Sequence, residues 1–497
     1  MAVIDLGSNS GRVVVLDFDE HGALEILADG RSPLRLARDV APTGRLSREA
    51  IGRALDALQD FEAIASGSGA RRTLAVATAA IREAANGQEL LERIRARTGV
   101  EVRLIDGAEE ARLSFMGAVY SLPIDHGMVA DIGGGSMELS RFRDRRLIQS
   151  WTLPVGALRM SDRYLISDPP TASEMEELAA EARRALEEQG VRSLESDERL
   201  IGTGGTIRNL AKIDRSSRAY PIPRLDGYVL GRRRVEELVD LLSHRRLARR
   251  RSIAGLNADR ADSIVGGALV ARAALDCLGA VDITVSGRGL REGLAFDSVG
   301  GRLPSVLHVR KASVAALASR FASWDAGRAD RRSAIAARLL GTLEPEAGPS
   351  VEERIDQAAT ILDIGRSIDF YRRYEHTADI LVASDLAGFT HRRLALLAAV
   401  VRQAGDEGMS VRLYRPLLGP GDAPPVARAA AVLDVSDEIA QRVAPGRRRL
   451  PVACEVRGPD IRLTAPIFDP ARQARLDARF RRAFGKRLLI SPAGGSP

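Results

Sequence analysis

The chain has 497 residues, more than one hydrophobic core usually holds, so several domains are expected. Hydrophobic residues make up 45% of it and charged residues 28%, a balance typical of a soluble globular protein and not of a disordered one. No apolar run reaches the ~18 residues that span a bilayer. Because no basic-then-apolar signal opens the sequence either, we expect a cytoplasmic protein without an integral membrane segment.

The net charge of +7 is carried mainly by arginine. Arginine forks match phosphate oxygens bidentately, so the charge favours a polyanionic partner, although arginine bias is also typical of proteins from GC-rich genomes. Only 4% of residues are aromatic, which leaves little surface for stacking bases. We therefore expect extended phosphate chains and not nucleic acid. Cys277 and Cys454 lie too far apart in sequence to indicate a disulfide framework or a cysteine zinc site.

The first 120 residues predict an α/β domain. Ile51, Leu55 and Leu58 recur at three- and four-residue steps, as on one face of an amphipathic helix. We expect strands at residues 2–6, 12–19, 23–31, 73–77 and 100–105, and helices at 47–64 and 106–120.

A second α/β unit begins near Pro123. Its long helix at 171–188 opens near a capping-box pattern formed by Ser173 and Glu176. Basic clusters at 232–234 and 244–251 flank another helix; they are either a solvated face or a path for a polyanion. We expect strands at 128–130, 147–153, 199–201 and 281–285, and helices at 171–188, from 207, 235–242 and 261–278.

From about Pro304 the sequence becomes rich in arginine and alanine, and it predicts helices interrupted at 344–350 and 417–425. The last fifty residues predict a hairpin at 452–456 and 461–465, then a helix at 470–484 and a strand at 488–490.

One motif occurs twice. Asp131 ends a short apolar strand and is followed by three glycines and Ser136, and the segment that begins at Asp5 also fits the pattern Asp-x-Gly-x-x-Ser. Glycines let the backbone turn sharply and aim successive N–H groups at a phosphate oxygen. Alone, the glycine run is equally typical of a simple hairpin. Two copies indicate two related halves that face each other across a phosphate.

Three further segments allow both a structural and a functional interpretation. Arg82 is either a surface charge or a phosphate ligand. Glu109 and Glu110 either balance a helix macrodipole or point into the cleft between the two turns. A strand, a glycine turn at 202–206 and a helix together form a ready anion site.

Taken in order, the motifs resemble the exopolyphosphatase and guanosine pentaphosphate phosphatase (Ppx/GppA) family of the actin, sugar-kinase and heat-shock ATPase superfamily. The motifs that carry the resemblance lie at residues 5–10, 77–84, 107–112, 131–138, 202–206 and 286–293. The resemblance implies an α/β fold of two ribonuclease-H-like domains (1–122 and 123–302). A helical, degenerate HD-like domain (303–447) and a small C-terminal α+β unit (448–497) would follow.

The resemblance also implies the site residues. Glu110 is expected to activate water, and Arg82 to contact the phosphate. Asp131 and Glu138 are expected to hold Mg²⁺, with Mn²⁺ as the alternative, and Asp5 to face them from the other half. The implied phosphate-binding loops are Gly7, Ser8, Asn9 and Ser10, then Gly133, Gly134, Gly135 and Ser136, then Gly204, Gly205 and Thr206.

The third domain departs from the family pattern. Leu362 occupies the histidine position of the His-Asp pair, before Asp363, and only His376 remains of the histidines expected downstream. Leucine cannot ligate a metal, so we expect this domain to serve packing, dimerisation or substrate capture.

The sequence therefore predicts a Mg²⁺-dependent exopolyphosphatase, expected as a homodimer from the resemblance alone. Hydrolysis of guanosine pentaphosphate (pppGpp) uses the same terminal phosphate and is the first alternative. A kinase of the same superfamily, or a non-catalytic phosphate sensor, belongs to another class. The retained Glu110, Asp131 and Glu138 argue against a sensor. No P-loop motif is present.

Overall fold

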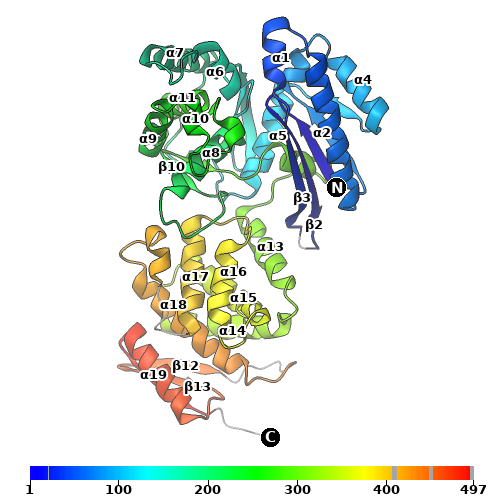
Figure 1. Cartoon of the computed structure of the whole chain (residues 1–497). Helices are drawn as coiled ribbons and strands as arrows, with labels where there is room; N and C mark the ends of the chain where they lie inside the picture. The colour runs from blue at the N-terminus through cyan, green and yellow to red at the C-terminus, as the bar shows by residue number, and fades with distance from the viewer. Residues whose placement is uncertain (21, 406–410, 447–451, 493–497) are drawn as a thin grey trace. The chain divides into compact units, whose positions relative to one another are not determined.

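The computed structural model describes residues 1–20, 22–405, 411–446 and 452–492. The chain separates into two compact units (Figure 1). Unit 1 contains Met1–Tyr220 and Arg224–Val309, and unit 2 contains Pro221–Pro223 and the described residues from Arg310 onward. The predicted boundary at 447/448 lies outside the described residues, and the four-domain division stays a prediction. No helix in the described ranges is long and apolar enough to cross a membrane.

Unit 1 contains two lobes, each built on one sheet. The first sheet has the strand order β3-β2-β1-β4-β5. Its central strands β1 and β4 are parallel, while β2 and β3 extend the sheet as antiparallel neighbours. The strands are β1 (Ala2–Leu6), β2 (Ser10–Phe18), β3 (Leu24–Pro33), β4 (Thr73–Ala77) and β5 (Val102–Leu104).

The helices of the first lobe bury an apolar face against this sheet. α2 turns Ile51, Leu58 and Phe61 into the core, as its three- and four-residue spacing predicts. The helices are α1 (Leu36–Thr43), α2 (Arg48–Gly67), α3 (Ala79–Glu83) and α4 (Gly87–Thr98).

The second sheet repeats the first. Its order is β10-β11-β9-β6-β7-β8, in which β6 pairs antiparallel with β7 and parallel with β9, as β1 pairs with β2 and β4. This repetition agrees with the two related halves that the duplicated motif indicates. The strands are β6 (Gly127–Ile132), β7 (Met137–Arg143), β8 (Arg146–Leu153), β9 (Arg199–Thr203), β10 (Val229–Gly231) and β11 (Asp282–Val285).

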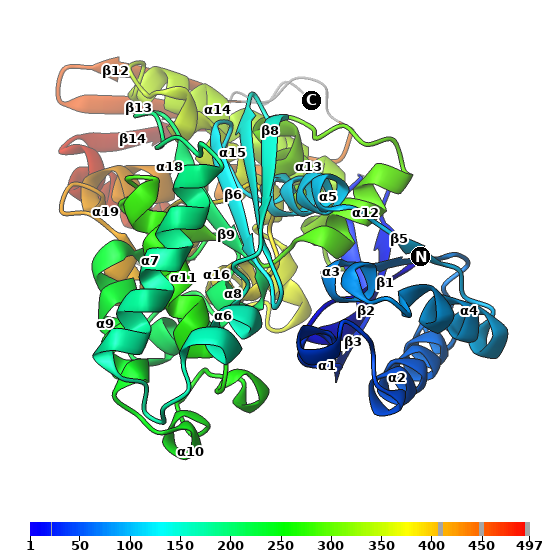
Figure 2. The ribbon, with the colours of Figure 1, turned by 90° about the horizontal axis from the view of Figure 1, so that it is seen from above.

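Figure 2 shows the second sheet between α5 on one side and α7, α9 and α11 on the other. The long helix α7 is capped by Thr171 and Glu174, so the predicted cap of Ser173 and Glu176 is wrong by two residues. The helices are α5 (Gly107–Tyr120), α6 (Ala157–Tyr164), α7 (Ala172–Glu188), α8 (Gly204–Ser216), α9 (Arg232–Ser243), α10 (Leu247–Arg250), η1 (Ala258–Arg260), α11 (Ile264–Cys277) and α12 (Leu290–Ser298).

α12 follows the second sheet in sequence but packs against α5 and against β1 of the first lobe. The contact with α5 needs glycine, because a Cβ on Gly117 would lie 1.9 Å from the carbonyl oxygen of Gly289. A Cβ on Gly293 would likewise lie 1.8 Å from that of Leu113. This close pair of helices joins the two lobes.

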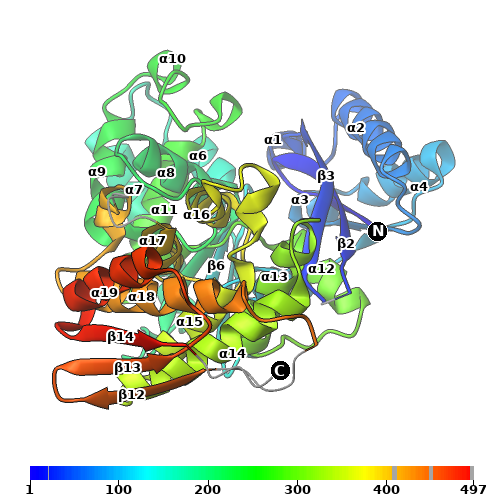
Figure 3. The ribbon, with the colours of Figure 1, turned by 90° about the horizontal axis from the view of Figure 1, so that it is seen from below.

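Unit 2 is mainly helical, and its division from unit 1 falls inside α13. At its end, β12 pairs antiparallel with β13, and β14 pairs parallel with β13 after the crossover helix α19, which also packs on α18 (Figure 3). The elements are α13 (Val306–Ser319), α14 (Ala326–Leu343), α15 (Pro349–Ile361), η2 (Ile364–Ser367), α16 (Arg373–Ala383), α17 (His391–Gly405), η3 (Arg412–Leu417), α18 (Ala423–Ala440), β12 (Ala453–Arg457), β13 (Asp460–Thr464), α19 (Pro470–Phe484) and β14 (Arg487–Ser491).

The predicted loss of a metal dyad in unit 2 has a structural counterpart. Leu362 is fully buried in the core, and Asp363 beside it is ion-paired with the equally buried Arg332 of α14. The same guanidinium donates to Asp437 of α18 at 2.7 Å, so a protein cation lies between the two carboxylates.

Candidate active site

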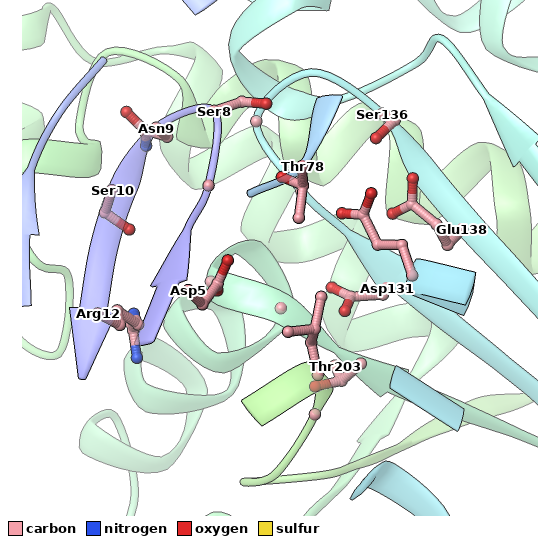
Figure 4. Close-up of a pocket in the computed structure, with 18 of the residues that line it drawn as sticks. Asp5, Ser8, Asn9, Ser10, Arg12, Thr78, Asp131, Ser136, Glu138 and Thr203 are labelled. Carbon is pink, nitrogen blue, oxygen red and sulfur yellow. The ribbon is translucent and has the colours of Figure 1, made fainter. Parts of the chain in front are cut away.

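A cavity of about 110 Å³ lies between the two lobes of unit 1, and both glycine turns contribute to its wall (Figure 4). The lining residues come from the ends of strands and the starts of helices in both lobes. They are Asp5, Gly7, Ser8, Asn9, Ser10, Arg12, Thr78, Glu110, Asp131, Gly133, Gly134, Gly135, Ser136, Glu138, Thr203, Gly204, Gly205, Arg208, Arg260, Gly289, Leu290, Arg291 and Glu292.

The two turns have the same backbone geometry. In the first, the N–H of Gly7 donates to the carbonyl of Ser10 at 3.3 Å; in the second, the N–H of Gly133 donates to that of Ser136 at 3.0 Å. The turns also face each other closely, since a Cβ on Gly134 would lie 3.0 Å from the Cβ of Asn9. This explains why the second turn is built from consecutive glycines.

A helix start fixes each turn from outside the cleft. The N–H of Ala37 in α1 donates to the carbonyl of Ser8, and the N–H of Leu158 in α6 donates to that of Gly134, both at 3.0 Å. Each turn is therefore held by hydrogen bonds to a helix of its own lobe.

The centre of the cavity is acidic. Asp131 and Glu138 are opposite residues on the paired strands β6 and β7, and Glu110 reaches them from the first turn of α5. Asp131 accepts a hydrogen bond from the Ser114 hydroxyl at 2.7 Å, while one oxygen each of Glu110 and Glu138 is buried without a hydrogen-bond partner. Asp5 faces Asp131 from the first lobe, as Figure 4 shows.

Burial and mutual repulsion make these carboxylates weak acids. Burial, followed by the charges of Asp5 and Asp131, raises the pKa of Glu110 to about 8. Burial raises the pKa of Asp5 to about 6 against the opposing effect of Arg291 and Arg12. Burial and the Glu110 carboxylate raise the pKa of Glu138 well above its usual range. Such a group of destabilised charges is typical of a functional site.

The geometry separates the two adjacent glutamates of α5. Glu110 lines the cavity, whereas Glu109 is ion-paired with Arg103 at 2.6 Å outside it. Arg82 is not part of the lining: its guanidinium donates to the carbonyl of Ile105 at 2.6 Å and lies 3.6 Å from Glu110. Arg82 therefore lies next to Glu110 but outside the residues that line the cavity, and its contact with phosphate stays a prediction.

The third predicted loop reaches the cavity through Gly204 and Gly205. Gly204 has φ +85°, and a Cβ there would lie 2.5 Å from a carboxylate oxygen of Asp131, so two constraints require glycine. Thr206 does not line the cavity, since it is buried against Gly267 of α11.

Sequence reasoning missed the basic part of the lining, which consists of Arg12, Arg208, Arg260 and Arg291. Within the described residues, none of Arg12, Arg208 and Arg260 forms an ion pair with a carboxylate. Burial and neighbouring guanidinium groups lower the pKa of Arg12 to about 8 and that of Arg260 to about 10. Concentrated positive charge without a partner favours an anion from solution.

One of these arginines could have been found from the repeat. Arg12 pairs with Asp5 across β1 and β2 in the same register in which Glu138 pairs with Asp131 across β6 and β7. The duplicated hairpin therefore presents an arginine on one lobe and a glutamate on the other. Arg208, Arg260 and Arg291 lie on separate elements, and no local pattern joins them.

The carboxylates fit a hydrated divalent cation. Buried oxygens of Asp5, Glu110 and Glu138 accept no hydrogen bond, so they are free to receive one from metal-bound water. The part of the chain that the structure describes has no group of three or more His, Cys, Asp or Glu side chains arranged to hold a metal on their own. Mg²⁺ suits such a site, because it binds through one or two carboxylates, several waters and substrate phosphate.

Comparisons with known proteins point to one family. The sequence profile of the Ppx/GppA phosphatase family matches residues 14–301, and that of Ppx/GppA phosphatase domain III matches residues 309–408. Exopolyphosphatase 1 of Mycobacterium tuberculosis is 30% identical over 318 residues, which cover 63% of this chain and 92% of the relative.

Solved structures agree with this assignment. A Ppx/GppA family member of Aquifex aeolicus superposes with a TM-score of 0.53 at 28% identity, covering 60% of this chain and 96% of that one. An exopolyphosphatase from Cytophaga hutchinsonii superposes with a TM-score of 0.55 at 27% identity, covering 61% and 99%. The predicted fold class is thereby confirmed.

Proposed function

Because the chain belongs to the Ppx/GppA phosphatase family, we propose that it is an exopolyphosphatase, which removes terminal orthophosphate from inorganic polyphosphate. Membership in this family makes the chain a hydrolase. The observation that carries the choice of substrate is the charge pattern of the cavity. Its carboxylates gather around Asp131, while Arg12, Arg208 and Arg260 line the same cavity and form no ion pair with a carboxylate of the described residues.

In the proposed reaction the terminal phosphate lies between the turns at 7–10 and 133–136, whose N–H groups bind its oxygens. A water oxygen attacks the terminal phosphorus while the bond to the bridging oxygen breaks. The bridging oxygen leaves with the electron pair on the shortened chain, which the arginines hold. Glu110 receives the proton of the attacking water, and its raised pKa suits a base of this kind.

Asp131 and Glu138 would hold Mg²⁺, or Mn²⁺, partly through water, with Asp5 close to the same ion. When bound, the ion neutralises charge on the transferred phosphoryl group. Arg82 acts in this proposal through Glu110, whose carboxylate it orients at 3.6 Å.

The lining favours polyphosphate over pppGpp. No aromatic residue occurs among the described residues that line the cavity, so a guanine base finds no ring to stack on there. Polyphosphate needs only charge along its length, which the arginines supply.

The test measures orthophosphate release from long-chain polyphosphate and from pppGpp, side by side, with Mg²⁺. We expect faster release from polyphosphate and a ~10²–10⁴-fold lower kcat in Glu110→Gln. Glu109→Gln is the matched control, because its carboxylate is ion-paired outside the cavity. A preference for pppGpp would make the nucleotide the substrate, and release from neither despite binding would indicate a sensor. Low activity in Glu109→Gln with an active Glu110→Gln would reverse the assignment of the base.

A further inference from the structure

A second cavity, of about 470 Å³, lies behind the two glycine turns of unit 1. It shares Ser8 and Gly135 with the first cavity and shares none of its arginines. The rest of its lining comes from α1, α3 and α6: Ala37, Val40, Ala80, Glu83, Leu158, Arg159, Asp162 and Arg163.

The wall between the cavities is a contact of two loops. A Cβ on Gly135 would lie only 3.1 Å from the hydroxyl of Ser8. Ser8 belongs to the first lobe and Gly135 to the second. Since each turn is fixed to a helix of its own lobe, a small separation of the lobes parts these two residues and joins the cavities.

The two ends of the first cavity differ. In Figure 4, Ser8 and Ser136 lie at one end, and Arg12 and Thr203 lie at the other. In the proposed reaction, a polyphosphate chain would fill the end around Arg12, where Arg208, Arg260 and Arg291 lie close enough to act on its charge. The orthophosphate cut from it would be left beside Ser8 and Gly135 and could not return past the chain unless the chain dissociated.

We propose, resting on the proposed function, that the second cavity is the exit for orthophosphate. The cavity has room for the product with its water, since one water occupies ~30 Å³ in the liquid. Arg163 at its rim is exposed and has no ion-pair partner in the described ranges, which suits a passing anion. Polyphosphate can then stay bound while each product leaves.

Ion pairs between the lobes cross this exit. Glu83 of α3 pairs with Arg159 of α6 at 2.6 Å, and Arg38 of α1 pairs with Asp162 of α6 at 2.9 Å. Their side chains are about a third or more exposed, and such pairs are each worth ~0–1 kcal/mol. They can therefore close the exit and still open in every catalytic cycle.

The experiment separates cleavage from release. Acid-quenched samples give total phosphate formed in the first turnovers on long-chain polyphosphate, and a fluorescent phosphate-binding sensor gives free phosphate. Arg163→Trp places a large ring at the rim of the second cavity from an exposed position. We expect unchanged first-turnover cleavage with free-phosphate release slowed by about 10-fold or more.

Arg163→Glu is a second variant that leaves the fold intact, because the residue is exposed. It should slow release several-fold, again without affecting cleavage. Ala172→Trp, at the exposed start of α7, is the matched control and should behave as wild type. The proposal that the second cavity is the exit would be overturned if both test variants release phosphate at the wild-type rate. It would also be overturned if cleavage and release are slowed equally. Absence of cleavage by the wild-type protein refutes the proposed function itself, which is a different result.

Discussion

Each unit of the molecule buries a cluster of acidic and basic side chains, and the two clusters differ in how their charges are matched. In unit 2, the fully buried Arg332 donates to both Asp363 and Asp437. Asp437 also accepts hydrogen bonds from the guanidinium of Arg373 and from the hydroxyl of Tyr374, each at 3.0 Å. Opposite charges hold the pKa of Asp437 far below its usual range in spite of burial.

In unit 1, like charges lie together instead. The carboxylates around Asp131 raise one another's pKa, and Arg12 and Arg208 crowd each other in the same cavity. Matched charges stabilise a folded chain, whereas unmatched ones destabilise it and bind ions from solution. The comparison teaches that burial of charge alone does not mark a site; like charges buried together, with too few opposite charges to match them, do.

The largest expected effect comes from removing a carboxylate of the unit 1 cluster. Asp131→Asn should lower kcat/KM for polyphosphate by about 10³-fold, since a bound metal contributes several kcal/mol to such reactions. The amide oxygen can still accept from Ser114, so the fold should be kept and its melting temperature should not fall. Asp60→Asn, on an exposed turn of α2, removes the same charge and should keep full activity. Substantial activity in Asp131→Asn would remove Asp131 from the proposed site.

The second effect comes from breaking the matched cluster of unit 2. Arg332→Met removes the fully buried cation that Asp363 and Asp437 share and leaves them only the less buried Arg328, Arg366 and Arg373. This should cost about 3 kcal/mol of unfolding free energy. Urea unfolding followed by Trp324 fluorescence in a Trp151→Phe background reports this unit, because Trp324 lies inside it and its indole donates to Thr360.

A triple variant checks the cause of this loss. Adding Asp363→Asn and Asp437→Asn to Arg332→Met removes the two carboxylates that lost their shared buried cation and should recover part of the stability. The loss in the single variant should also shrink as pH falls and the carboxylates gain protons. An Arg332→Met protein as stable as wild type would show that the pairing does not matter.

The contrast also explains what could be predicted from the sequence. The glycine turns, Asp5 and Asp131 lie within single hairpins, so a local pattern reveals them, whereas Glu138 was assigned through the family resemblance. Most strands of both sheets were predicted nearly to their ends from their apolar runs. Strand β7, which carries Glu138, and the short β10 were not predicted, and neither were helices α1, α4 and α6. Glu110 was identified through the family resemblance, and its separation from Glu109 needed the structure.

Apart from Arg12, which the repeat points to, the basic part of the site could not be predicted. Arg208, Arg260 and Arg291 meet only because α8, η1 and α12 converge on the cavity. In a chain with so much arginine, no single one stands out. The family resemblance assigned a phosphate contact to Arg82, which the structure places 3.6 Å from Glu110 and outside the lining residues. Long-range convergence of common residue types leaves no trace in the sequence pattern.

A third prediction concerns how far the buried Glu110 carboxylate of unit 1 lowers the free energy of unfolding. The pKa of Glu110 is raised from 4.5 to about 8 in the folded protein. Between these pH values the unfolded chain has already released the proton that the folded chain keeps, so stability falls as pH rises. Glu110→Gln has no such proton, and in metal-free buffer it should melt higher than wild type at pH 8.

The gain should be absent near pH 4, where Glu110 is protonated in both states. Each kcal/mol of unfolding free energy corresponds to a shift of about 2–4 °C in the melting temperature of a domain of this size. Differential scanning calorimetry of both proteins in EDTA at the two pH values measures it. An equal melting difference at pH 4 and pH 8 would mean that Glu110 does not titrate as the structure indicates.

The smallest effect is the pH dependence of metal binding. A cation at Asp131 and Glu138 must displace protons, because burial raises the pKa of both groups. Mg²⁺ affinity, measured by calorimetry without substrate, should therefore increase by about 10-fold from pH 6.5 to 8.5. Asp131→Asn should abolish the binding, while Asp363→Asn should leave it unchanged, since Arg332 already lies between the carboxylates of unit 2. A change in Mg²⁺ affinity in Asp363→Asn would contradict this prediction. It would place the metal at the carboxylates of unit 2, whose charge is already matched by arginine.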